Sequence, residues 1–214
     1  MRIITESIVV RANAHNPSIL NPLFLKSEGI VPVDWDTVDG PICTPPLSIV
    51  KFNSGVEFLV DSQILQVSQN TEPIIRSEYD VPSCVARYIS VLPHVPYTAV
   101  GINFDALVAC QNPEQFLIQT FLKTGKWNYG NQLLLALSLR LVYQKENWRL
   151  TISLEPNQRL DTFGLSQSIS ITANFHVDIP GIDRVKETNY AVSEFSAQRT
   201  YFKELISNII SIGD

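Results

Sequence analysis

The chain has 214 residues, of which 45% are hydrophobic and 17% charged, and its formal net charge is −5. This hydrophobic content excludes intrinsic disorder, and the length suffices for one domain with a substantial core. The 16 basic residues are outnumbered by 21 acidic ones and form no basic run, so the positive surface that nucleic-acid binding requires is missing. We therefore expect a single domain over residues 1–214, with a surface poor in charge and no nucleic-acid partner.

The cysteines and the apolar stretches indicate the compartment. Cys43, Cys84 and Cys110 are odd in number and lack a C-x-x-C pair, which predicts free thiols in a reducing environment and no zinc site. Glu6 interrupts the apolar core that a signal peptide would need. The most apolar stretch, residues 133–143, is shorter than the ~20 residues of a spanning helix. We expect a cytoplasmic protein without membrane, metal or cofactor.

The first part of the chain predicts a strand, a short helix and a hairpin. Residues 6–14 are β-branched and partly alternating, and Pro22 opens a helix that ends before Gly29. The Pro-rich stretch 31–46 is expected to be a loop. Residues 47–69 predict two strands that turn at Ser54-Gly55, because glycine permits the positive φ of hairpin turns.

The rest of the chain alternates between helical and strand periodicity. Apolar residues at helical spacing predict helices over 81–92, 113–124 and 193–212. Period-two alternation predicts strands over 97–110, 132–144, 148–154 and 166–179. The predicted class is α+β: about seven long, mainly antiparallel strands in a curved sheet, with two mid-chain helices and a C-terminal helix packed on it.

Two local clusters of titratable residues invite a chemical interpretation. Residues 34–40 resemble the start of a calcium loop, but Val38 and Pro45 stand where oxygen ligands are needed. His176 and Asp178 lie two apart on one predicted strand, so their side chains share a face and could act as base and orienter. They are the catalytic candidates; a polar outer face is the alternative interpretation.

Two further groups are candidates for binding. Ser168, Ser170, Thr172 and Asn174 form a neutral face on one predicted strand, and short uncharged side chains allow close approach by another surface. We take them as interface candidates. The ligand-pocket candidates are Trp127, Tyr129 and Trp148, for which core or edge packing is the alternative.

The order of elements resembles a sporadically distributed prokaryotic family of uncharacterised α+β proteins of about this length. The resemblance is carried by Ser54-Gly55 with residues 56–69, by residues 100–104 centred on Gly101, and by residues 177–179 before the last helix. It implies a fold and a bacterial setting, and no activity.

Three functions remain open at this stage. The first is a non-catalytic interaction or assembly module that acts as a homo-oligomer or with a protein partner. The second is a small-ligand-binding domain with an apolar pocket between the sheet and the helices. The third is a hydrolase or isomerase that uses His176 and Asp178.

Overall fold

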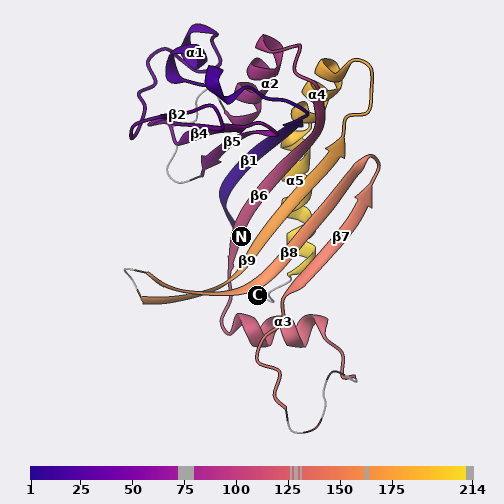
Figure 1. Ribbon diagram of the computed structural model, residues 1–214. Coiled ribbons are helices and arrows are strands. Elements are labelled where there is room, and N and C mark those ends of the chain that lie inside the picture. Colours follow the sequence, from indigo (N-terminus) through magenta and orange to yellow (C-terminus); the bar gives the residue numbers. More distant parts are fainter. Residues whose placement is uncertain (72–79, 126, 128–129, 131, 162–163, 211–214) are drawn as a thin grey trace.

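The computed structural model describes residues 1–71, 80–125, 127, 130, 132–161 and 164–210, without the side chains of 159–161 and 164–166. Within these ranges, one open antiparallel sheet has the order β2-β3-β4-β5-β1-β6-β9-β8-β7 (Figure 1). Its strands are β1 (Arg2–Ala12), β2 (Ile42–Cys43), β3 (Leu47–Lys51), β4 (Val56–Asp61), β5 (Ile64–Asn70), β6 (Tyr97–Ala109), β7 (Leu139–Lys145), β8 (Trp148–Asp161) and β9 (Gly164–Asp178).

The helices of the described ranges are α1 (Pro22–Ser27), α2 (Val81–Val91), α3 (Pro113–Phe121), α4 (Arg184–Ser193) and α5 (Phe195–Ile209), with a short 3₁₀ turn, η1 (Pro17–Ile19). The predicted α+β class with an antiparallel sheet is confirmed. The predicted numbers differ from the structure: within the described ranges the sheet has nine strands, not about seven, and there are five helices, where the sequence predicted a short one at Pro22 and three longer ones.

The missed elements have weak sequence signals. Residues 56–69 are two strands, β4 and β5, because the Asp61 carboxylate accepts hydrogen bonds from the N–H groups of Gln63 and Ile64 at 2.7 and 2.8 Å. This aspartate turn needs neither Gly nor Pro. The C-terminal helix was predicted as one segment but is preceded by α4, whose start is capped by Asp183. The apolar stripe of α4 is too narrow to detect in the sequence.

The core lies on one face of the sheet. Phe104 of β6 is fully buried, stacks on Phe202 of α5 with ring centroids 5.4 Å apart, and meets Phe175 of β9 edge to face at 6.0 Å. Figure 1 shows α5 behind the long strands, while their front face carries no helix. The alternation in β9 follows this division, since Ile169, Ile171, Ala173 and Phe175 are buried. The front face of the long strands is therefore the polar one.

The β7 strand starts later than its sequence pattern predicts. Pairing with β8 begins at Leu139, opposite Leu154, so the predicted strand 132–144 is a strand only from Leu139 onward. Beyond this pair, β8 carries Pro156 and continues with β9 into a two-stranded arm that leaves the sheet (Figure 1). Proline has no N–H to offer to a ladder and is confined to strands without an outer neighbour. Residues 132–138 consequently have no place on β8.

Candidate functional site

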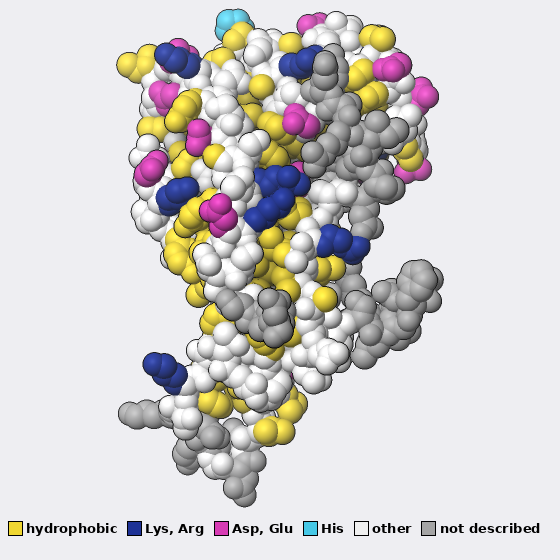
Figure 2. All heavy atoms as spheres, turned by 180° about the vertical axis from the view of Figure 1, so that it is seen from behind, with side chains coloured by type: hydrophobic (Ala, Val, Ile, Leu, Met, Phe, Trp, Pro, Cys, Tyr) yellow, Lys and Arg dark blue, Asp and Glu magenta, His cyan; other side chains and the backbone are white. Residues whose placement is uncertain are grey.

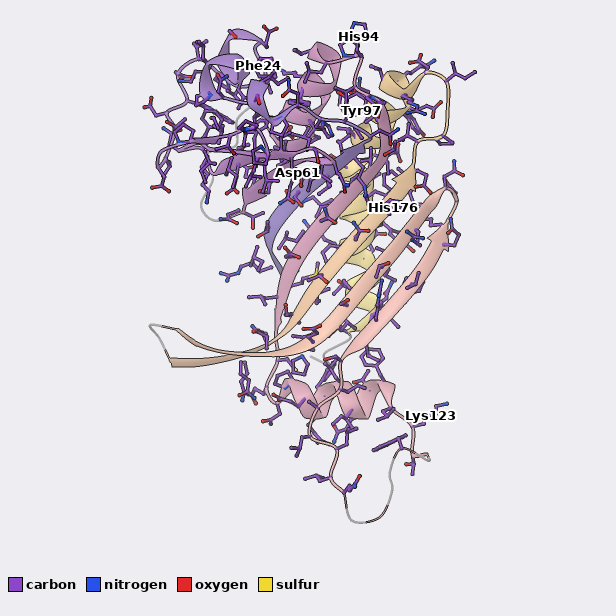
Figure 3. All side chains as sticks on the ribbon, viewed as in Figure 1. Phe24, Asp61, His94, Tyr97, Lys123 and His176 are labelled. Atoms are coloured by element: carbon purple, nitrogen blue, oxygen red, sulfur yellow. The ribbon has the colours of Figure 1, made fainter. Side chains whose placement is uncertain are left out.

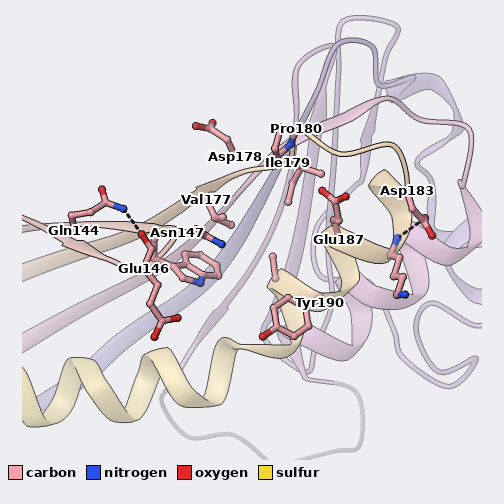
Figure 4. Close-up of a pocket in the computed structure, with 13 residues that line it drawn as sticks. Gln144, Glu146, Asn147, Val177, Asp178, Ile179, Pro180, Asp183, Glu187 and Tyr190 are labelled. Atoms are coloured by element: carbon pink, nitrogen blue, oxygen red, sulfur yellow. Dashed lines mark hydrogen bonds between the residues drawn. The ribbon is translucent and has the colours of Figure 1, made fainter.

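A cavity of about 810 Å³ opens where three elements meet: the β7–β8 turn, the end of β9 and helix α4 (Figure 4). Its lining residues are Gln144, Glu146, Asn147, Trp148, Val177, Asp178, Ile179, Pro180, Asp183, Lys186, Glu187, Tyr190 and Ala191. Pockets for small molecules typically measure about 300 to 1,000 Å³. The cavity is therefore large enough for a small organic ligand.

Two aromatic side chains line this cavity from opposite elements. Trp148 is the first residue of β8, pairs with Lys145 across the turn, and is buried at 7% exposure. Tyr190 on α4 is 68% exposed. Val177 and Ile179 add apolar surface from the end of β9. The cavity thus combines a fixed apolar wall with an aromatic ring that is open to solvent.

Acidic side chains dominate the charge at the cavity. Among the described residues that line it, Lys186 is the one cation against four carboxylates, those of Glu146, Asp178, Asp183 and Glu187. Figure 4 shows Glu146 on the β7–β8 turn and Glu187 on α4, whereas Asp178 points away from α4. The local charge favours a cationic ligand over an anionic one.

Two of the acidic side chains already accept hydrogen bonds from the backbone. The backbone N–H of Gly181 donates to Glu187 Oε2 at 3.1 Å, and the N–H of Lys186 donates to Asp183 Oδ1 at 3.2 Å. Asp183 therefore serves as the N-cap of α4. A Cβ on Gly181 would fall 1.5 Å from Glu187 Oε1, so glycine is what allows Glu187 to reach this backbone. The loop after β9 thus fixes the Glu187 carboxylate at the cavity.

The structure brings the predicted pair His176 and Asp178 together. Nε2 of His176 lies 3.1 Å from Asp178 Oδ1. Asp178 lines the cavity and its side chain is 83% exposed, whereas His176 is not among the lining residues. Figure 3 shows His176 on β9, well away from His94 at the top of the molecule. The pair has the contact that acid-base chemistry needs, with the His176 side chain 23% exposed and the carboxylate open to solvent.

The predicted interface residues lie on the polar face of β9 with different degrees of cover. Ser168 is buried and its hydroxyl accepts a hydrogen bond from Asn157 Nδ2 at 3.0 Å. Asn174 is partly buried and bonded to Asn103 of β6. Ser170 is partly buried and Thr172 is exposed. Of the four, Thr172 is the residue most open to a partner.

The predicted aromatic candidates do not form one group. Trp148 lines the cavity, but Trp127 does not; its indole N–H donates to the Lys123 carbonyl at 2.7 Å, and Tyr129 lies outside the described residues. On the face seen in Figure 2, most charged side chains lie on the upper part of the molecule, whereas hydrophobic side chains are spread from the upper part to the lower end. The low charge of the chain is thus unevenly distributed.

Sequence reasoning missed most of the cavity. Glu146, Glu187 and Tyr190 come from a turn and a helix about 40 residues apart, and proximity across such separations is a property of the sheet order. The sequence did predict the turn that carries Glu146. In the structure this is a two-residue turn between the paired residues Lys145 and Trp148, and Glu146 has the positive φ, 53°, that such turns favour.

Comparisons with known proteins assign no role to this site. No family model matches the chain, and no curated protein matches it. In the described ranges, no helix is both long enough and apolar enough to cross a bilayer.

Proposed function

We propose that this chain binds a small organic cation, an amine on an apolar body, in the cavity between the β7–β8 turn, β9 and α4. The observation that carries the proposal is the combination in one cavity of Trp148 and Tyr190 with the carboxylates of Glu146 and Glu187. This develops the ligand-binding alternative predicted from the sequence.

Each part of such a ligand has a counterpart in the cavity. An ammonium group is attracted both to carboxylates and to the face of an aromatic ring, and the latter contributes roughly 0.5–1 kcal/mol at exposed sites. The Glu187 carboxylate accepts one hydrogen bond, from the Gly181 N–H to Oε2, and a carboxylate can accept several, so acceptor capacity is left for a ligand. The apolar body of the ligand would cover Trp148 and Val177, which line the same space. An anionic ligand of the same shape would meet the carboxylates of Glu146 and Glu187.

Isothermal titration calorimetry with two probes of equal shape and opposite charge tests this directly. Phenethylamine carries an ammonium group where phenylpropionate carries a carboxylate. We expect phenethylamine to bind at millimolar concentration or below and phenylpropionate not to bind. Failure of phenethylamine to bind, or equal binding of both probes, would contradict the proposal.

Single substitutions locate the binding. Glu187→Gln is expected to weaken phenethylamine binding by up to about fivefold, because one partly exposed charge contact is worth up to about 1 kcal/mol. Tyr190→Ala should weaken it to a similar extent. Glu204→Gln on α5 removes an exposed carboxylate that does not line this cavity and is the matched control. Equal weakening by Glu204→Gln would indicate a mere effect of net charge.

His176 and Asp178 support a second candidate function, hydrolysis or isomerisation, because of their 3.1 Å contact. A panel of nitrophenyl esters offered to the purified chain tests the hydrolase. Ester turnover by the intact chain that is lost in His176→Ala would favour the hydrolase. No ester turnover by the intact chain, together with phenethylamine binding that persists in His176→Ala, would favour the binding function.

A further inference from the structure

Residues 132–138 are an apolar segment that belongs to no strand of the structure. Their sequence is Gln-Leu-Leu-Leu-Ala-Leu-Ser, and they lead directly into the edge strand β7. No backbone hydrogen bond joins them to another described residue. Leu133 and Leu135 are 81% and 73% exposed. Strand-like apolar segments with free backbone groups are templates for pairing with another chain.

In sequence, the segment continues the period-two pattern of β7. Leu137, Leu139 and Tyr143 pack partly buried against the core, so the odd-numbered side chains share the core face. Leu133 and Leu135 would extend the same row if residues 132–138 adopted a strand conformation on pairing. The even-numbered face carries Leu134 and Val142, 38% and 56% exposed. Residues 139–144 thus present a free strand edge, and the apolar residues 132–138 precede it in the chain.

We propose that two copies of this chain associate by pairing residues 132–144 antiparallel about a twofold axis at Ser138. This interaction surface meets the cavity at Gln144, which belongs to both. In this register the two chains place Leu133 against Tyr143, Leu134 against Val142, Leu135 against Leu141, Ala136 against Arg140, Leu137 against Leu139, and Gln132 against Gln144.

The pairing is self-complementary in both size and charge. Every odd-numbered residue in 133–143 is Leu or Tyr, so the core-side face of the joint ladder is fully apolar. Arg140 is the only charged residue of 132–144, and it faces Ala136 instead of its own copy. Directly opposed like charges, which destabilise strand pairs, do not occur in this register. A closed twofold contact of this kind ends in a dimer, not in a filament.

Engineered cysteines test the axis. Directly opposed residues of an antiparallel pair have Cα atoms about 4.5–5.5 Å apart, within the range of a disulfide. In a Cys43→Ser background, which removes the exposed native thiol, Ser138→Cys is expected to give a covalent dimer under mild oxidation. Val142→Cys is the matched control, because the register places it opposite Leu134. Efficient cross-linking of Val142→Cys with little cross-linking of Ser138→Cys would overturn the register.

Sedimentation velocity at micromolar concentration tests the association itself. The intact chain is expected to be dimeric, and Leu135→Glu is expected to shift it to monomer, because two buried glutamates would lie beside the axis. Leu23→Glu on α1 is the matched control, since Leu23 is 76% exposed but distant in sequence from the edge. A monomeric intact chain, or a dimer that persists in Leu135→Glu, would overturn the proposal.

Discussion

Asn174 donates a side-chain hydrogen bond to Asn103 Oδ1 at 2.5 Å, across the ladder between β9 and β6. Asn103 in turn donates to Ser7 Oγ of β1 at 3.3 Å. These three side chains connect three neighbouring strands on the polar face of the sheet. Gly101, on the same face of β6, gives the Asn174 side chain its room, since a Cβ there would lie 3.1 Å from Asn174 Nδ2.

Gly101→Ala is therefore expected to lower the free energy of unfolding by about 1 kcal/mol, the typical worth of a hydrogen bond that a displaced amide loses. Urea denaturation measures the change. Gly40→Ala is the control, because no atom lies within 4 Å of a Cβ at Gly40. In an Asn174→Ala background, Gly101→Ala should cost less, and an undiminished cost would show that the glycine acts through another contact.

Gly181→Ala is expected to disturb the cavity through Glu187. The new methyl group would lie 1.5 Å from Glu187 Oε1 and would drive the carboxylate off the loop. We expect weaker phenethylamine binding together with a lower melting temperature. The double variant Gly181→Ala/Glu187→Ala should recover the stability but not the binding. Recovery of both would remove Glu187 from the binding site.

His15 should make stability depend on pH. Its Nε2 donates to the Val10 carbonyl at 3.2 Å, and Nδ1 is buried without a hydrogen-bond partner among the described residues. Burial lowers the pKa of His15 below its ordinary value, against the raising effects of Val10 and Asp61. As the pH falls through about 6.5, the His15 side chain of the unfolded chain takes up a proton, whereas that of the folded chain stays neutral. Stability from this group is complete above that pH and is lost as the pH falls toward the folded-state pKa.

Urea titrations between pH 7 and pH 5.5 measure this effect. His15→Phe should flatten the pH dependence, whatever its effect on the absolute stability. His94→Gln, at an exposed histidine, should leave the slope unchanged. An unchanged slope in His15→Phe would show that other groups cause the acid sensitivity.

Thr172→Lys distinguishes the polar face from the strand edge as the contact between copies. Thr172 is exposed on β9, in the middle of the polar face and away from β7, because β8 lies between the two strands. We expect sedimentation of Thr172→Lys to show the same dimer as the intact chain. A shift to monomer would identify the predicted neutral face of Ser168, Ser170, Thr172 and Asn174 as the interface.

The sequence predicted those elements whose signals are local. The inward row of β9 and the turn at Gly55 follow from alternation and from glycine, and the structure contains both. The start of β7 does not follow, because alternation is unbroken from residue 132 and the pairing ends at Leu139 for a reason on another strand, Pro156. The cavity was out of reach for the same kind of reason. Its carboxylates and aromatic rings come together through the order of strands, which residue periodicity does not contain.

The central position of β1 has a consequence for how the chain folds. β1 pairs with β5 on one side and with β6 on the other, where Val10 lies opposite Val100. The second edge of β6 pairs with β9, which comes later in the chain, and there Val100 lies opposite Val177. Contacts this distant in sequence close large loops and slow folding. The units β3 to β5 can form early, but β1 and β6 each keep an unsatisfied edge until later residues arrive. We expect refolding to be slow and to depend on protein concentration, because an intermediate with an incomplete sheet exposes unpaired strand edges that can associate with another chain.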